Sequence, residues 1–93
     1  MTSQEIQESF KKYNEHFGKF NEIENKFHFN KKLCAMLKIA SYFEKNPSEF
    51  VFDTRDGEMF LPVSPCITDE DVLYLVRCGV WFDFVQDSFC ILV

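Results

Sequence analysis

The sequence predicts an α+β fold in which three helices pack on one face of a small antiparallel sheet made of two hairpins. Capping residues precede three segments with helical periodicity, and short apolar runs flank two turns. Along the chain these elements follow the order helix, helix, hairpin, helix, hairpin. With 93 residues, of which 46% are hydrophobic, the chain 1–93 is expected to form one compact domain.

The first helix is announced by Thr2 and Glu5, which have the spacing of a capping box. Apolar residues then recur at helical steps of four and three: Ile6, Phe10, Tyr13, Phe17 and Phe20. On the opposite side, three glutamates each precede a lysine by four residues, the spacing of a helix ion pair: Glu8, Glu15 and Glu22. This register predicts one helix over residues 3–26. A break at Gly18 is the alternative, since Gly costs about 1 kcal/mol relative to Ala inside a helix.

The second helix and the first hairpin follow. Asn30 is the expected cap of a helix that ends at Asn46-Pro47. Its predicted buried stripe is Leu33, Met36, Leu37, Ala40 and Phe43. Residues 50–52 and 59–63 are then expected to form two strands around a turn at Asp56-Gly57, with Arg55 and Glu58 facing each other.

The third helix is expected to begin after the cap Thr68 and to end near Arg77, with Gly79 just beyond it. Its first turn carries Asp69, Glu70 and Asp71. Its predicted buried side is Val72, Leu73 and Val76. Residues 80–85 and 89–93 are predicted to form the second hairpin, joined at residues 86–88.

Charge divides the chain unevenly. The formal net charge is −5, and residues 1–45 carry a net of +2 whereas residues 46–93 carry a net of −7. An acidic surface argues against direct binding of nucleic acid or of anionic membranes and favours a basic partner. The chain shows neither a secretory signal nor an apolar run long enough to span a bilayer, so a cytoplasmic location is expected.

Catalytic and metal-binding motifs are absent from the sequence. The four cysteines lack zinc or iron–sulfur spacing, and the expectation is that they are reduced and mostly buried: Cys34, Cys66, Cys78 and Cys90. No phosphate-binding or nucleophile motif is present, and the chain has only three glycines. The chain is therefore expected not to be an enzyme and to need no metal or cofactor. A thiol-dependent enzyme is the alternative, and it requires a cysteine with unusual reactivity.

The second half supplies the candidate partner-binding residues, all of them acidic: Asp53, Asp56, Glu58, Asp69, Glu70, Asp71, Asp83 and Asp87. Few basic residues lie near them in sequence. Local roles are the simpler interpretation for some, because three begin a helix and Asp56 lies in a turn. These roles do not remove the charge, and we therefore expect the eight acids to contact a basic surface of a partner.

The segment ITDEDVLYLVRCGVWFDFVQDSFCILV, residues 67–93, resembles the terminal segments of small early proteins of T-even bacteriophages. In length and charge the chain most resembles their anti-restriction nuclease inhibitors. That resemblance implies a homodimer that imitates duplex DNA and occupies the DNA-binding site of a host restriction endonuclease, McrBC. The acids named above would then stand in for phosphates, and the host bacterial cytoplasm would be the location.

Charge density sets a condition on this hypothesis. About 30 Å of duplex carries roughly 18 phosphates, far more than a net charge of −5. Mimicry therefore requires one continuous acidic surface with the lysines turned away, extended across a dimer. Twelve phenylalanines also favour a dimer interface, with core filling as the alternative. A different function remains open, that of an adaptor which binds a host protein through an apolar surface and uses its acidity only for solubility.

Overall fold

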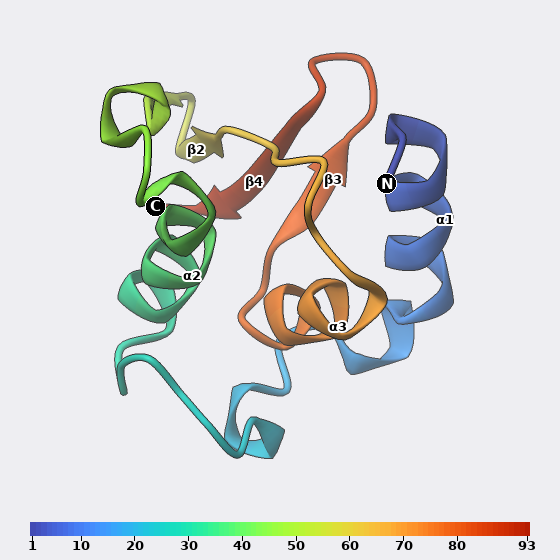
Figure 1. Ribbon diagram of the computed structural model, residues 1–93. Coiled ribbons are helices and arrows are strands. Elements are labelled where there is room, and N and C mark those ends of the chain that lie inside the picture. Colours follow the sequence, from blue (N-terminus) through green and yellow to red (C-terminus); the bar gives the residue numbers. More distant parts are fainter.

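The computed structural model describes residues 1–93 and confirms the predicted order of elements (Figure 1). It contains three α-helices and one four-stranded antiparallel sheet: α1 (Ser3–Lys12), α2 (Lys31–Ala40), β1 (Asp53–Arg55), β2 (Glu58–Leu61), α3 (Asp69–Arg77), β3 (Trp81–Asp83) and β4 (Ser88–Leu92). Four single 3-10 turns lie in the links between them. None of the helices has both the length and the apolar character needed to cross a membrane.

The sheet joins the two hairpins through their inner strands. Its order is β1-β2-β4-β3, and every neighbouring pair is antiparallel. Asp56 and Gly57 both have positive φ, 52° and 79°, which gives the two-residue turn that matches the twist of a hairpin. Arg55 and Glu58 are cross-strand partners, as predicted.

The strand bounds differ from the prediction: β1 lies entirely after the predicted residues 50–52, β2 and β3 are shorter than predicted, and β4 begins and ends one residue early. β1 begins at Asp53 rather than Phe50, because Phe50 turns toward Phe43 and its ring lies 6.0 Å from that ring. β2 ends at Leu61, directly before Pro62, which has no backbone N–H to give to a ladder. The link between β3 and β4 runs over residues 84–87, so it starts two residues and ends one residue earlier than expected.

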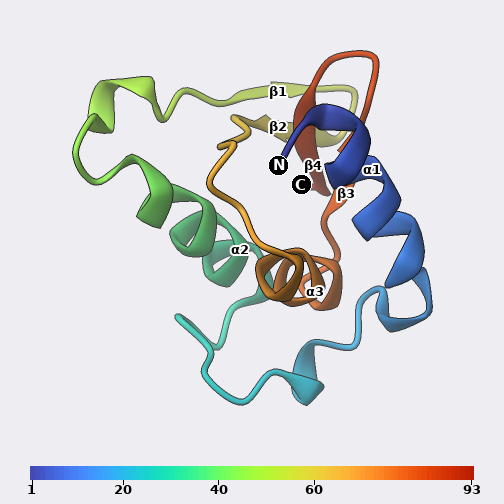
Figure 2. The ribbon, with the colours of Figure 1, turned by 45° about the vertical axis from the view of Figure 1, so that its right-hand side comes forward.

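The helices cover one face of the sheet, and the core lies between them. In Figure 2, α2 and α3 lie below the strands and α1 lies beside β3. Strand register assigns Met59, Leu61, Phe82, Phe89 and Ile91 to this inner face, because side chains alternate and cross-strand partners share a face. The other face, which we name the outer face, consists of Asp53, Arg55, Glu58, Phe60, Trp81, Asp83, Ser88, Cys90 and Leu92.

Helix α1 is less than half as long as predicted. The capping box at Thr2 and Glu5 is present, and Ile6 and Phe10 are buried. The helix nevertheless ends at Lys12, and the prediction of one helix over residues 3–26 is wrong. Gly18 has a φ of +77°, which no helix interior allows, and its N–H donates to the carbonyl of Val76 at the end of α3, 3.0 Å away. This contact rules out a helix through residue 18, although α1 already ends six residues earlier, where Tyr13 is its C-cap.

Helix α2 starts at the predicted cap, where the Asn30 side chain accepts from the N–H of Leu33. Its buried face differs from the prediction. The buried residues are Cys34, Ala35 and Ile39, while Leu33 and Leu37 are 45% and 46% exposed. The helix is rotated relative to the predicted stripe because Lys38, on the side of Cys34, is turned toward α3 and forms an ion pair there.

Helix α3 agrees closely with the prediction made from the sequence. Thr68 accepts from the N–H of Asp71, and Gly79 follows the helix with a φ of +84°. Val72 and Val76 are buried as predicted, and Leu75 is buried where Leu73 was expected.

Candidate acidic interface

The structure divides the eight predicted acids into three sets. Three lie on the outer face of the sheet: Asp53, Glu58 and Asp83. Two lie in the hairpin connections: Asp56 and Asp87. Three lie in the first turn of α3: Asp69, Glu70 and Asp71. The sheet and its connections thus hold five of the eight, and α3 holds the rest on a different element.

The outer-face acids are brought together by strand pairing. Asp53 is the cross-strand partner of Phe60, and Glu58 lies opposite Leu92. Asp83 pairs with Ser88 on the other side of β4. Because cross-strand partners share a face, the three carboxylates surround an apolar centre on one surface. That centre is formed by Phe60, Trp81 and Cys90.

One cation lies within this surface. The guanidinium of Arg55 lies 3.3 Å from a carboxylate oxygen of Asp53, 4.5 Å from the centre of the Phe60 ring, and donates to Gln86 over 2.7 Å. The Arg55 side chain therefore lies along the outer face and pairs with Asp53 instead of Glu58. Glu58 has no cation within ion-pair distance, and neither has Asp83.

The acids of the hairpin connections have local roles that leave their charge exposed. Asp56 supplies the left-handed first residue of the two-residue turn. Asp87 also has a positive φ, 50°, and accepts a hydrogen bond of 2.7 Å from the hydroxyl of Ser3. Neither carboxylate pairs with a cation. Residues 53–61 and 81–92 together carry five carboxylates and one guanidinium, a net charge of −4.

Asp69 is neutralised by the first half of the chain. Its carboxylate accepts from Lys12 and Ser9 of α1 and, at 3.2 Å, from Tyr13. These hydrogen bonds, that of Lys12 foremost, lower the pKa of Asp69 and raise that of Lys12. Asp69 therefore joins α1 to α3 and presents little net charge to a partner.

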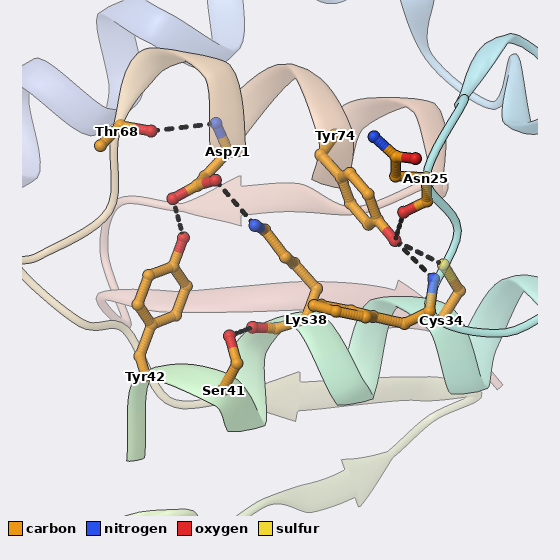
Figure 3. Close-up of polar contacts among 9 residues, drawn as sticks. Asn25, Cys34, Lys38, Ser41, Tyr42, Thr68, Asp71 and Tyr74 are labelled. Carbon is orange, nitrogen blue, oxygen red and sulfur yellow. Dashed lines mark hydrogen bonds and ion pairs between the residues drawn. The ribbon is translucent and has the colours of Figure 1, made fainter. Parts of the chain in front are cut away.

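Asp71 has a similar role between α2 and α3 (Figure 3). Lys38 pairs with one carboxylate oxygen over 2.8 Å, and the Tyr42 hydroxyl donates to the other. Partial burial alone would raise the pKa of Asp71, but these two donors and Thr68 outweigh it and the pKa is lowered. The same network and burial raise the pKa of Tyr42. Of the α3 acids only Glu70 lacks a cationic partner.

The cysteines are unpaired, and three of the four are buried: Cys34, Cys78 and Cys90. The hydroxyl of Tyr74 lies 3.1 Å from the sulfur of Cys34 and donates to the carbonyl of Asn25 (Figure 3). Burial raises the pKa of the Cys78 thiol and of the Cys90 thiol. Both groups are held in the unreactive thiol form, opposite to what a thiol nucleophile needs.

The predicted helix ion pairs are not formed. Lys12 pairs with Asp69 instead of Glu8, Glu22 lies near His16 and Arg77, and the ammonium of Lys26 donates to the carbonyl of Ile23. Five exposed lysines have no carboxylate partner, and all lie outside the sheet: Lys11, Lys19, Lys31, Lys32 and Lys45. Residues 53–61 and 81–92 thus carry −4 of the total net charge of −5, while the rest of the chain, where exposed lysines lie among exposed glutamates, carries a net of −1.

Sequence periodicity missed one surface. Phe27, Phe29, Leu33 and Leu37 are all exposed, Phe29 by 91%. They lie on the link before α2 and on the solvent side of that helix. Leu33 and Leu37 were assigned to the core because they fit a helical stripe. The cap at Asn30 fixed where the helix begins but not which side it buries.

Comparison with known proteins adds no relative: the chain matches no protein-family model, no curated protein and no solved structure.

Proposed function

We propose that the chain is a non-enzymatic inhibitor that binds the basic DNA-binding surface of a host protein through the outer face of its sheet. The observation that carries this proposal is the grouping of five carboxylates on the sheet and its connections, opposed there only by Arg55. The unpaired lysines lie on the other elements, so the acidic side can enter a basic cleft without bringing them along. The McrBC restriction endonuclease, suggested by the resemblance to phage inhibitors, is the first host protein to test.

The proposed contact does not include Asp69 and Asp71 in the first turn of α3. Lys12 and Lys38 neutralise Asp69 and Asp71, so these two residues are assigned to the fold. A sheet with a net charge of −4 offers fewer negative charges than the DNA it would replace, because DNA-binding proteins contact about 6–10 phosphates. Two copies side by side would present eight net negative charges, within that range. We therefore propose that the inhibitor acts as a homodimer, which light scattering at working concentration can establish.

Competition binding tests the inhibitor function. Purified chain is added to McrBC bound to a fluorescent duplex that carries its modified cytosine, and the anisotropy of the duplex is followed. The expected result is that the wild-type chain displaces the duplex, because both would compete for the same basic DNA-binding surface through their negative charge. A chain that leaves the duplex bound even at low salt, where charge contacts are strongest, contradicts the proposal.

Charge neutralisation then locates the contact. The test variant carries Asp53→Asn, Glu58→Gln and Asp83→Asn, which keep the shape of the outer face. The matched control carries three such changes at exposed acids outside the sheet: Glu8→Gln, Glu15→Gln and Glu44→Gln. We expect the test variant to displace DNA at least about tenfold less well than the control. Equal loss in both variants would assign the effect to net charge and not to the outer face.

The apolar surface along α2 favours a second candidate function. Phe27, Phe29, Leu33 and Leu37 lie exposed near Lys31 and Lys32, a combination that suits a host protein with an acidic and apolar surface. The chain would then be an adaptor, and the acids of its sheet would keep it in solution. Leu33→Ser with Leu37→Ser would abolish adaptor binding and leave DNA displacement unchanged, so the two functions can be separated.

A further inference from the structure

A groove lies between helix α1 and the edge strand β3. Its lining on the helix comes from Gln7, Phe10 and Lys11, which share one face of α1 because they are three and four residues apart, and Asn14 of the following 3-10 turn continues this wall. Its lining on the sheet is the whole of β3 together with Phe84. The cavity between them has a volume of about 590 Å³, in the range of ligand sites. A helix face and an edge strand therefore form its two walls.

The edge of β3 is open along this groove. β3 pairs only with β4, and no backbone hydrogen bond links residues 81–83 to any other element. An edge strand presents unused N–H and C=O groups to any extended chain beside it. The opposite edge, β1, is fully exposed and carries Asp53 and Arg55, which hinder pairing.

Two polar groups in the groove have no partner within the chain. The side-chain oxygen of Gln7 is buried and accepts no hydrogen bond. The ammonium of Lys11 has no carboxylate within ion-pair distance. An unpaired buried acceptor costs about 1–3 kcal/mol, and a ligand that brings an N–H would remove this cost. The groove thus offers an acceptor at Gln7 and a cation at Lys11 beside an apolar body made by Phe10, Phe17 and Val80, while the carboxylate of Asp83 lies at its β3 wall.

We propose that this groove binds an extended peptide segment of a partner protein, which pairs with β3 as a fifth strand. One apolar side chain of the segment enters the cavity toward α1. A carboxylate two residues away, on the same side of the segment, reaches Lys11, and a donor of the segment meets Gln7. The sheet order then becomes β1-β2-β4-β3-segment, a known mode of peptide recognition between an edge strand and a helix.

The position of α1 favours a single segment over a second copy of this chain. In Figures 1 and 2, α1 lies on the side of β3 away from β4, so it flanks the open edge. Pairing of two β3 edges would bring two copies of α1 against each other, whereas helices pack 8–10 Å apart and strands only about 4.8 Å. An isolated strand carries no helix and avoids this conflict. The site adjoins the contact proposed for the acids, because Trp81 and Asp83 of β3 belong both to the groove lining and to the outer face.

A random peptide library tests the proposal on the full chain. Phage-displayed dodecapeptides are selected on immobilised protein, and the enriched sequences are synthesised with blocked ends. We expect enrichment of segments in which apolar and acidic residues alternate with a period of two. Binding is read from the fluorescence of Trp81, the single tryptophan of the chain, which lines the groove. Amide shifts in residues 81–83 and in α1 then locate the peptide.

Two controls decide the outcome. N-methylation of alternate peptide bonds should abolish binding in one register and spare it in the other, as strand pairing requires. Lys11→Glu should weaken the acidic peptides roughly tenfold, while Lys32→Glu, an equal charge change on α2, should leave them unaffected. The proposal is overturned if no peptide is enriched, if bound peptides shift α2 instead of β3, or if the β3 amides show that a second copy already occupies the edge.

Discussion

At the scale of single residues, the acids of the second half have two distinct roles. Asp69 and Asp71 join α3 to the other helices through Lys12 and Lys38, lysines that lie 57 and 33 residues earlier. Glu58 and Asp83 make no such contact and leave their charge to solvent. The sequence could place all of them in an acidic half, but local spacing carries no information about these distant partners. The sequence therefore could not predict which carboxylates remain free to bind a partner, because this depends on how the helices pack.

Asp71→Asn should destabilise the fold by about 2 kcal/mol at neutral pH, because it weakens charged hydrogen bonds to Lys38 and Tyr42. The pKa of Asp71 is lowered by folding, so its contribution is present above the unfolded value of about 3.9 and is lost as pH falls through the lower folded value. The difference from wild type should therefore shrink below about pH 4. Urea unfolding at several pH values measures it.

Glu44→Gln provides the control for this experiment, since Glu44 is exposed and forms no ion pair. It should change neither the stability at neutral pH nor its acid dependence. If Asp71→Asn were equally harmless, the α2–α3 network would have no part in holding the helices together.

At the scale of elements, the sequence-based prediction was accurate for features that neighbouring residues determine. The cap at Thr68, the turn at Asp56-Gly57 and the cap at Asn30 are all where the sequence placed them, because each depends on residues within a few positions. The end of α1 and the buried side of α2 were wrong. Both regions make contacts with residues distant in the sequence: Lys12, the last residue of α1, pairs with Asp69, and Lys38 of α2 pairs with Asp71.

Gly18→Ala tests whether residue 18 needs its left-handed backbone conformation. A Cβ at this position meets nothing within 4 Å, so the change acts only through the left-handed backbone at φ +77°. We expect a loss of about 1–2 kcal/mol in the free energy of unfolding. Lys19→Ala, in the same link with a negative φ, should cost much less. A gain of stability and of helical circular dichroism in Gly18→Ala would instead indicate that the helix continues through residue 18.

At the scale of the whole molecule, most of the net negative charge lies on the sheet. The sheet carries a net of −4, and the unpaired lysines belong to the first half of the chain and its helices. The acidic residues 46–93 predict this asymmetry in outline, but the outer face on which three of the acids meet follows from the pairing of β2 with β4. That pairing joins residues about 30 positions apart, beyond the reach of any turn motif.

The central claim is that the outer face of the sheet binds a basic surface through its charge, and a salt titration tests it most directly. The affinity of the wild-type chain for McrBC is measured by calorimetry from about 50 to about 200 mM salt, beside the Asp53→Asn, Glu58→Gln, Asp83→Asn variant. We expect the wild-type affinity to fall steeply and the variant to show a distinctly shallower dependence. An affinity that is indifferent to salt, or equal slopes for both proteins, would contradict the claim and favour binding through the apolar surface of α2.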